Sequence, residues 1–130
     1  MKFVVRSFFR GLRVVLGPVM LLWEFLTRPK GIVRPPALQK QIDQECQDFV
    51  LYQFRTCPFC IKVRQELRRL SLTIESRDAQ KDQHNREELE RGGGHVKVPC
   101  LKIMEPSGQS RWLYESGAII EYLRGRFAAR

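Results

Sequence analysis

The chain has 130 residues, enough for one domain and a modest appendage. Its net charge is +9, and 43% of its residues are hydrophobic, as in an ordinary globular protein. Four cysteines are too few for a secreted domain held together by disulfides, so a reducing compartment is expected.

The positive charge gathers in the N-terminal part of the chain. Residues 1–34 carry seven basic residues against Glu24 alone, a net +6. These charges alternate with aromatic and aliphatic residues, whereas nucleic-acid-binding tails are usually polar. We therefore expect residues 1–28 to form a basic, amphipathic helical arm that contacts a membrane surface and no nucleic acid.

The apolar part of this arm is short. Its uncharged stretch, Val14 to Trp23, falls below the ~20 residues that a spanning helix needs, and Pro18 should kink it. A cleaved signal peptide would need a small-residue cleavage site, which residues 26–30 lack. We expect an uncleaved anchor that lies in the interface or marginally spans it; an organelle presequence is an alternative.

A proline-rich segment separates the arm from the rest of the chain. Residues 29–36 contain three prolines. Proline fixes its own φ angle and restricts the residue before it, so this segment should be an extended linker. Residues 37–130 should then form the folded domain, which begins with a short polar helix over residues 37–47.

The domain alternates between strand and helix patterns. We expect strands at residues 49–54, 72–77, 98–104 and 111–114, and helices at residues 58–70, 85–91 and 116–127. Gly92 should cap the second of these helices. The first strand–helix–strand unit requires two parallel strands with a right-handed connection. The last two strands are close enough for a hairpin. The sequence therefore predicts an α/β domain of order β-α-β-α-β-β-α, with a mixed four-stranded sheet covered by helices on both faces.

The motif Cys57-Pro58-Phe59-Cys60 stands between the first strand and the first of these helices. Cys57 should lie at the helix N-terminus, with Pro58 at the first helical position, where its missing N–H group costs nothing. Unpaired N–H groups and the positive end of the helix favour a thiolate there. Cys60 lies one turn further and is more shielded. This arrangement suits one attacking and one resolving sulfur.

The alternative for this motif is a structural pair or half of a zinc site. A zinc site needs four ligands, which commonly come as two closely spaced pairs. The remaining cysteines and histidines, Cys46, Cys100, His84 and His95, show no such spacing. We therefore expect redox chemistry and no metal site, with Cys100 buried as a small apolar side chain.

The element order with its Cys-Pro-Phe-Cys motif resembles the thioredoxin fold in its glutaredoxin form. Val98-Pro99 opens the third strand, where this family carries a cis-proline. Glu115-Ser116 begins the last helix, as in glutathione transferase N-terminal domains. Lys97 stands where glutaredoxins often have threonine, as in some transferases. The three motifs occur in the expected order over residues 49–127.

The resemblance implies a glutathione-binding site. The backbone of Val98, beside the cis-proline Pro99, would pair with the cysteinyl part of glutathione like an added strand. Ser116 would bind the glutamyl α-carboxylate at the helix N-terminus, with the α-amino group near Glu115. Phe59 would form a wall of the site. Arg55 would either contact the glycyl carboxylate or serve as a surface cation near the cysteines.

The expected function is that of a dithiol glutaredoxin, a glutathione-dependent thiol–disulfide oxidoreductase like those bacterial domains that carry basic N-terminal arms. Two alternatives stay open: a module that binds a [2Fe–2S] cluster through glutathione, and a transferase or prostaglandin-synthase-like isomerase. The latter enzymes usually add a helical domain, which residues 1–130 do not contain. Expected partners are glutathione, disulfide-bonded or glutathionylated proteins, and the cytoplasmic face of a membrane.

Overall fold

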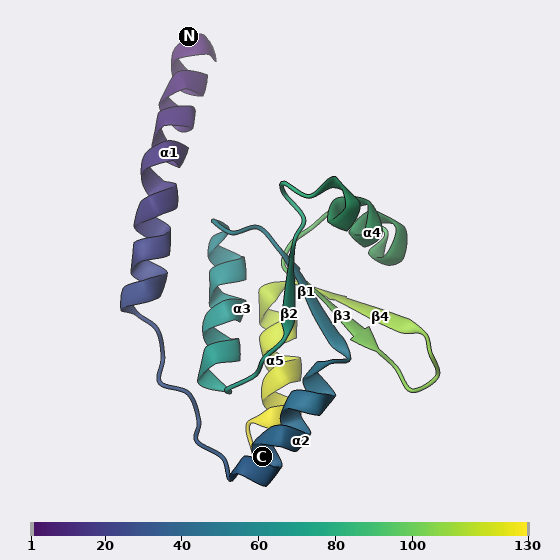
Figure 1. The fold of residues 1–130 in the computed structure, drawn as a ribbon. Coiled ribbons are helices and arrows are strands. Elements are labelled where there is room, and N and C mark those ends of the chain that lie inside the picture. Colours follow the sequence, from purple (N-terminus) through teal and green to yellow (C-terminus); the bar gives the residue numbers. More distant parts are fainter. Residues whose placement is uncertain (1, 130) are drawn as a thin grey trace.

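The computed structural model describes residues 2–129, with side chains for Ser7 and for residue 14 onward (Figure 1). Its elements are α1 (Lys2–Leu26), α2 (Pro36–Cys46), β1 (Phe49–Gln53), α3 (Pro58–Arg69), β2 (Glu75–Asp78), α4 (Gln83–Gly93), β3 (Cys100–Met104), β4 (Ser110–Tyr114) and α5 (Ser116–Phe127). The sheet order is β2-β1-β3-β4, with β1 parallel to β2 and antiparallel to β3. The predicted thioredoxin-like α/β fold is confirmed.

The side chains of the sheet alternate between two apolar cores. Leu51, Leu101 and Leu113 are paired across β1, β3 and β4. They belong to the larger core, which α2, α3 and α5 complete. Tyr52 and Cys100 point to the other face and pack with α4. Figure 1 accordingly shows α3 and α5 on one side of the sheet and α4 on the other. Because both faces of the sheet are packed against helices, the ends of β1 and β3 are held in fixed positions.

Strand β2 begins later than predicted, at Glu75. The preceding residues finish α3 instead. Ser71 has a φ angle of 54°, and the Leu72 N–H donates to the Leu67 carbonyl at 2.9 Å. This is a Schellman motif with serine in the position that glycine usually occupies, and Leu67 and Leu72 both join the core. Apolar residues that look like the start of a strand therefore belong to a helix cap.

The glycine triplet also differs from the prediction. Helix α4 continues through Gly92 and Gly93, and its left-handed cap is Gly94, with a φ angle of 88°. A Cβ atom at Gly92 would collide with the ring of Trp112, and one at Gly93 would collide with Tyr114. These two glycines let α4 approach β4 closely. Their role is in packing between elements, which sequence periodicity does not reveal.

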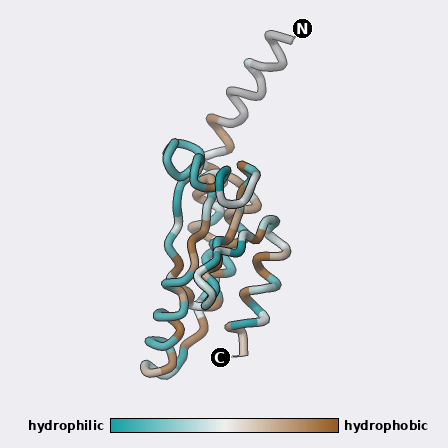
Figure 2. Tube along the Cα trace, turned by 90° about the vertical axis from the view of Figure 1, so that its right-hand side faces the viewer, coloured by the Kyte–Doolittle hydropathy of each residue, from teal (hydrophilic) through white to brown (hydrophobic). Residues whose placement is uncertain are grey.

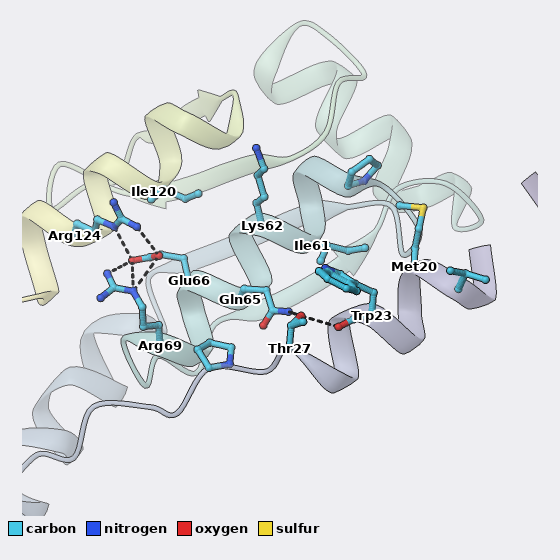
Figure 3. A pocket seen from close by; sticks show the side chains of 13 residues that line it. Met20, Trp23, Thr27, Ile61, Lys62, Gln65, Glu66, Arg69, Ile120 and Arg124 are labelled. Atoms are coloured by element: carbon cyan, nitrogen blue, oxygen red, sulfur yellow. Dashed lines mark hydrogen bonds and ion pairs between the residues drawn. The ribbon is translucent and has the colours of Figure 1, made fainter. Parts of the chain in front are cut away.

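Helix α1 extends beyond the domain at its N-terminal end and lies along α3 at its C-terminal end (Figure 1). Within the domain, hydrophobic and hydrophilic residues alternate along the chain (Figure 2). Helix α1 continues as one helix through Pro18. Gln65 on α3 donates a hydrogen bond at 3.2 Å to the hydroxyl of Thr27, the residue that follows α1 (Figure 3). Within the described residues, no helix has both the length and the apolar character required to cross a membrane.

The polarity of α1 is reversed relative to an ordinary surface helix. Glu24 faces the domain and is only 6% exposed. Leu22 and Leu26, one turn apart, are 56% and 69% exposed. Helices of globular proteins normally turn their apolar side inward. In α1 an acidic side chain is buried against the domain, and large apolar side chains are left in contact with solvent.

The proline-rich segment after α1 forms neither helix nor strand before Pro36, and it is bound to the domain. Arg34 is buried and donates hydrogen bonds to the carbonyls of Leu70 at 2.6 Å and Phe127 at 3.1 Å. The Ser71 hydroxyl donates to the Ile32 carbonyl at 2.7 Å. The ends of α3 and α5 thus hold the segment that leads from α1 into α2.

Glu66 on α3 is a buried carboxylate that accepts hydrogen bonds from Arg69 and Arg124 (Figure 3). Burial raises the pKa of Glu66, but the two guanidinium groups outweigh it and lower the pKa to about 2, against an ordinary value of 4.5. The folded state therefore binds fewer protons than the unfolded state between these pH values. The stability that this group contributes is present above pH 4.5 and is lost as the pH falls toward 2.

We expect the free energy of unfolding to decrease as the pH falls from 4.5 to 2, and Glu66→Gln to reduce this dependence. Urea unfolding followed by circular dichroism at a series of pH values measures it. Glu121→Gln is the matched control, because Glu121 is an exposed glutamate on α5. A pH dependence in Glu66→Gln as steep as that of the wild type would contradict the assignment.

Candidate active site

Cys57 lies at the junction of β1 and α3, where it is the N-cap residue of α3, and Pro58 opens the helix. Its carbonyl accepts the Ile61 N–H at 2.9 Å, and its own N–H donates to the Phe54 carbonyl at 3.4 Å. The Cys57 side chain is half-buried and makes no capping hydrogen bond. The predicted position of Cys57 at the positive end of a helix is confirmed, and the residue is partly exposed to solvent.

Cys60 lies one turn into α3 and is fully buried. Burial raises the pKa of Cys60 to about 12; a hydrogen bond from the Phe54 backbone opposes this shift, and the neighbouring Cys57 thiol adds to it. Both cysteines are free thiols. Cys60 is therefore protonated at neutral pH and must lose its proton when it takes part in a reaction.

A pocket of about 370 Å³ opens between the start of α3, the loop before β3 and the junction of β4 with α5. Five of the residues predicted to bind glutathione line it together: Phe59, Val98, Pro99, Glu115 and Ser116. The Val98–Pro99 peptide bond is cis, as predicted. The structure thus brings three separate motifs of the sequence to one cavity.

The junction of β4 with α5 has an unusual backbone. Glu115 has a φ angle of 74°, in the left-handed region that residues with side chains rarely occupy. It is the N-cap residue of α5, and its carbonyl accepts the Ile119 N–H at 3.0 Å. Ser116 and Gly117, the first residues of α5, line the pocket. The pocket therefore borders a helix N-terminus, where free N–H groups suit a carboxylate.

Arg55 is the one predicted glutathione contact that lies outside this pocket. It lines a separate cavity beneath α1, together with Arg28 and Arg64. The pocket contains Lys97 and Tyr114 instead, which the sequence analysis did not assign to the site. Lys97 directly precedes the Val98-Pro99 motif, and this position could have indicated that it lines the pocket. Tyr114 donates a hydrogen bond to the His95 carbonyl at 2.8 Å and so braces the same loop.

The other two cysteines lie inside the domain. Cys100, at the start of β3, is fully buried, as expected, and burial raises its pKa to about 12. Cys46 on α2 is also buried, and burial, with a smaller contribution from Asp43, raises its pKa to about 11. Neither is a reactive thiol at neutral pH. Among the described side chains, no group of three or more potential ligands could hold a metal ion.

Comparison with known protein families gives a match over residues 51–130 to the N-terminal domain of glutathione S-transferases. The chain belongs to this family. Comparison of this transferase-family domain with curated proteins found no match.

Solved structures similar to this transferase-family domain include two from Pseudomonas. One is a glutathione transferase family member from Pseudomonas fluorescens Pf-5 with two glutathione molecules bound (26% identity, TM-score 0.52, covering 69% of this chain and 40% of that chain). Another is a glutathione transferase from Pseudomonas putida with one glutathione disulfide per subunit (26% identity, TM-score 0.51, covering 72% and 41%). This domain therefore spans about two fifths of the length of these enzymes.

Glutaredoxin C1 from Populus tremula x tremuloides is a more distant match to the transferase-family domain (15% identity, TM-score 0.48, covering 72% of this chain and 92% of that chain). The comparisons thus show the transferase N-terminal domain family and the thioredoxin-like fold.

Proposed function

We propose that this domain is a glutathione-dependent thiol–disulfide oxidoreductase of the dithiol type, with Cys57 as the nucleophile and Cys60 as the resolving thiol. The observation that carries the proposal is the pairing of a solvent-accessible Cys57 at the start of α3 with a free, buried Cys60 one turn later. Backbone N–H groups at a helix N-terminus favour a negative charge on a sulfur placed there.

The first reaction is reduction of a glutathione mixed disulfide. The Cys57 thiolate attacks the glutathione sulfur, the S–S bond of the substrate breaks, and the substrate leaves as a thiolate that takes a proton from water. The thiolate of a second glutathione then attacks the Cys57–glutathione disulfide. This releases glutathione disulfide and restores the Cys57 thiolate. The net reaction converts the mixed disulfide and one glutathione into a protein thiol and glutathione disulfide.

A disulfide within or between proteins follows a second route. Attack by Cys57 forms a mixed disulfide with the substrate. Cys60 then attacks the sulfur of Cys57, and its proton passes to the departing substrate thiolate. The raised pKa of Cys60 suits this order of events, because Cys60 is held as a thiol until it is needed. Two glutathione molecules reduce the resulting Cys57–Cys60 disulfide and leave as glutathione disulfide.

Glutathione would occupy the pocket between Phe59 and the start of α5. Ser116 and the free N–H groups of α5 would hold its glutamyl carboxylate. The Val98 backbone would pair with its cysteinyl part, and Lys97, which lines the same pocket, would bind its glycyl carboxylate. The bound glutathione and glutathione disulfide in the two Pseudomonas transferases support glutathione as the co-substrate.

The function is tested by the reduction of a glutathione mixed disulfide, coupled to glutathione reductase. We expect turnover by the wild-type chain. Ser116→Ala should raise the KM for the mixed disulfide roughly tenfold with little change in kcat, because a hydrogen bond to a carboxylate is lost. Ser107→Ala is the control, since Ser107 is exposed in the turn between β3 and β4. No turnover by the wild type would disprove the proposed function.

We also propose that α1 binds an anionic membrane surface. Its exposed apolar side chains are accompanied by Arg28 and Lys30 and by the basic residues earlier in the helix. A basic helix with an exposed apolar face is typical of interfacial membrane binding. The proposed redox chemistry needs reduced thiols, which are kept in the cytoplasm, so we place the domain at the cytoplasmic face of the membrane. Its substrates would then be disulfide-bonded or glutathionylated proteins close to that face.

A second candidate function is conjugation or isomerisation of a substrate with glutathione, and the family match favours it. In that reaction a thiolate attacks carbon rather than sulfur, and Cys60 has no part. Conjugation of glutathione to chlorodinitrobenzene distinguishes the two functions. We expect conjugation to be undetectable under conditions in which the mixed disulfide is reduced.

A further inference from the structure

Arg64 on α3 connects the N-terminal helix with the loop that precedes Cys57. On one side, its Nε and one terminal nitrogen donate to the two carboxylate oxygens of Glu24, each at 2.8 Å. On the other side, the Arg55 carbonyl accepts at 2.8 Å, the Phe54 carbonyl at 3.4 Å and the Gln53 side chain at 2.8 Å. The five N–H groups of a guanidinium are thus all used.

The two charged groups at the centre of this arrangement are shielded from water. The side chains of Arg64 and Glu24 are 12% and 7% exposed. Glu24 is also the only acidic residue of α1. Arg68 also donates to Glu24, at 2.8 Å. Hydrogen bonding from Arg64, followed by that from Arg68, lowers the pKa of Glu24 despite its burial. The paired hydrogen bonds from its Nε and one terminal nitrogen to the two oxygens of one carboxylate fix the direction of the Arg64 guanidinium.

The contacts of Arg64 reach the backbone of the catalytic loop itself. The Phe54 carbonyl that accepts from Arg64 also accepts the N–H of Cys57. Only Thr56 separates the Arg55 carbonyl from Cys57. α1 approaches the same loop, since a Cβ at Gly17 would lie 3.6 Å from the Thr56 methyl group. A continuous series of hydrogen bonds therefore runs from α1 through Arg64 to the Cys57 N–H.

We propose that Glu24 and Arg64 form a clamp through which α1 positions the Cys57 loop, so that the N-terminal helix is part of the active site and not a detachable anchor. The inference rests on the proposed redox function for its consequence in catalysis. Glu24 and Arg64 are positioning residues, since neither lines the glutathione pocket. Because Arg64 joins Glu24 of α1 to the Phe54 and Arg55 carbonyls, the Cys57 loop keeps a fixed position relative to α1.

The physical reason is the geometry of arginine. A planar guanidinium can donate to a carboxylate on one edge and to carbonyls on the other at the same time, whereas a lysine ammonium cannot span both. Without Glu24, Arg64 would be a shielded cation without its principal counter-ion. It would then turn toward solvent and release the Phe54 and Arg55 carbonyls.

The test uses the full chain with three variants, Glu24→Gln, Arg64→Lys and Arg68→Gln. The last is the matched control, because Arg68 binds the same carboxylate without a hydrogen bond to the loop. We expect Glu24→Gln and Arg64→Lys each to lower kcat for the mixed disulfide roughly tenfold, with KM little changed. Arg68→Gln should stay within about twofold of the wild type in both constants. The double variant should lose no more than the worse single variant, because both act on one clamp.

Hydrogen exchange followed by mass spectrometry separates the clamp from the proposed function. Exchange over residues 54–60 should become faster in Glu24→Gln and Arg64→Lys and stay unchanged in Arg68→Gln, with α4 as an internal reference. Equal kcat and equal loop exchange in all three variants would overturn the clamp. If the wild type lacks activity, the redox assignment fails, and loop exchange still decides the clamp. If Glu24→Gln does not fold, Arg64→Lys decides alone, since it keeps the positive charge in place.

Discussion

Replacing Cys57 with serine is expected to lower the reduction of a glutathione mixed disulfide by at least ~1000-fold, because no other described thiol can act as the nucleophile. Cys60 is fully buried and has a pKa raised to about 12. Cys46 and Cys100 are buried as well. The coupled glutathione reductase assay measures the loss. Full activity in Cys57→Ser would remove the basis of the proposed mechanism.

Replacing Cys60 with serine gives the matched comparison, since it removes the other sulfur of the same motif. With a glutathione mixed disulfide, the rate should fall less than about tenfold, because a second glutathione resolves the intermediate. With a protein disulfide, Cys60→Ser should trap the covalent intermediate with Cys57, which non-reducing electrophoresis detects. If Cys60→Ser lost activity toward the glutathione mixed disulfide to the same extent as activity toward the protein disulfide, Cys60 would do more than resolve the intermediate.

Replacing Leu22 and Leu26 with glutamine is expected to weaken binding to anionic vesicles by about 100-fold, since each leucine loses roughly 1.5 kcal/mol or more of burial in the lipid. Both side chains lie on the exposed face of α1, away from Glu24. Glutamine is a good helix former, so α1 should persist. Co-sedimentation with phosphatidylglycerol vesicles measures the change.

Val33→Gln is the control for this experiment, because Val33 is 88% exposed but lies in the proline-rich segment after α1. We expect it to bind vesicles like the wild type. Binding of the wild type should also weaken as salt is added, since the charges of the helix are then screened. If the double leucine variant and the wild type sediment equally, α1 does not bind membranes through its apolar face.

The two α1 proposals make different demands on one helix. Vesicle binding depends on Leu22 and Leu26, which face solvent, whereas the clamp depends on Glu24, which faces the domain. Variants of one set should therefore leave the other property unchanged. A basic amphipathic helix is usually read as an anchor alone. The burial of its single carboxylate against Arg64 is what points to a second role.

Local signals in the sequence were enough to predict most of the fold and the centre of the site. The proline after Cys57 and the apolar period of the residues that follow determine where α3 begins, because both act within one or two turns. The same holds for Ser116 at the start of α5 and for the hairpin of β3 and β4. Val98-Pro99 was identified by resemblance.

Only the tertiary structure decided which of the charged and small residues meet. Arg55 was a reasonable candidate from its position near Cys57, but Lys97 is the cation in the pocket. Gly92 and Gly93 resemble a loop until Trp112 and Tyr114 are seen to pack against them. Such contacts join residues far apart in the chain, and they depend on how two elements approach, which neither composition nor periodicity encodes.

The amphipathic character of α1 was readable from the sequence, but the direction in which it faces was not. Sequence alone shows one acid within a basic, apolar helix. The structure pairs this acid with an arginine 40 positions later. A lone charge in an apolar helix can point to water or be buried against a partner, and the partner's position settles which state has the lower free energy. Features that depend on residues within one or two turns, such as where α3 and α5 begin, follow from the sequence alone. The attachment of α1 to the Cys57 loop depends on how this helix packs against the domain.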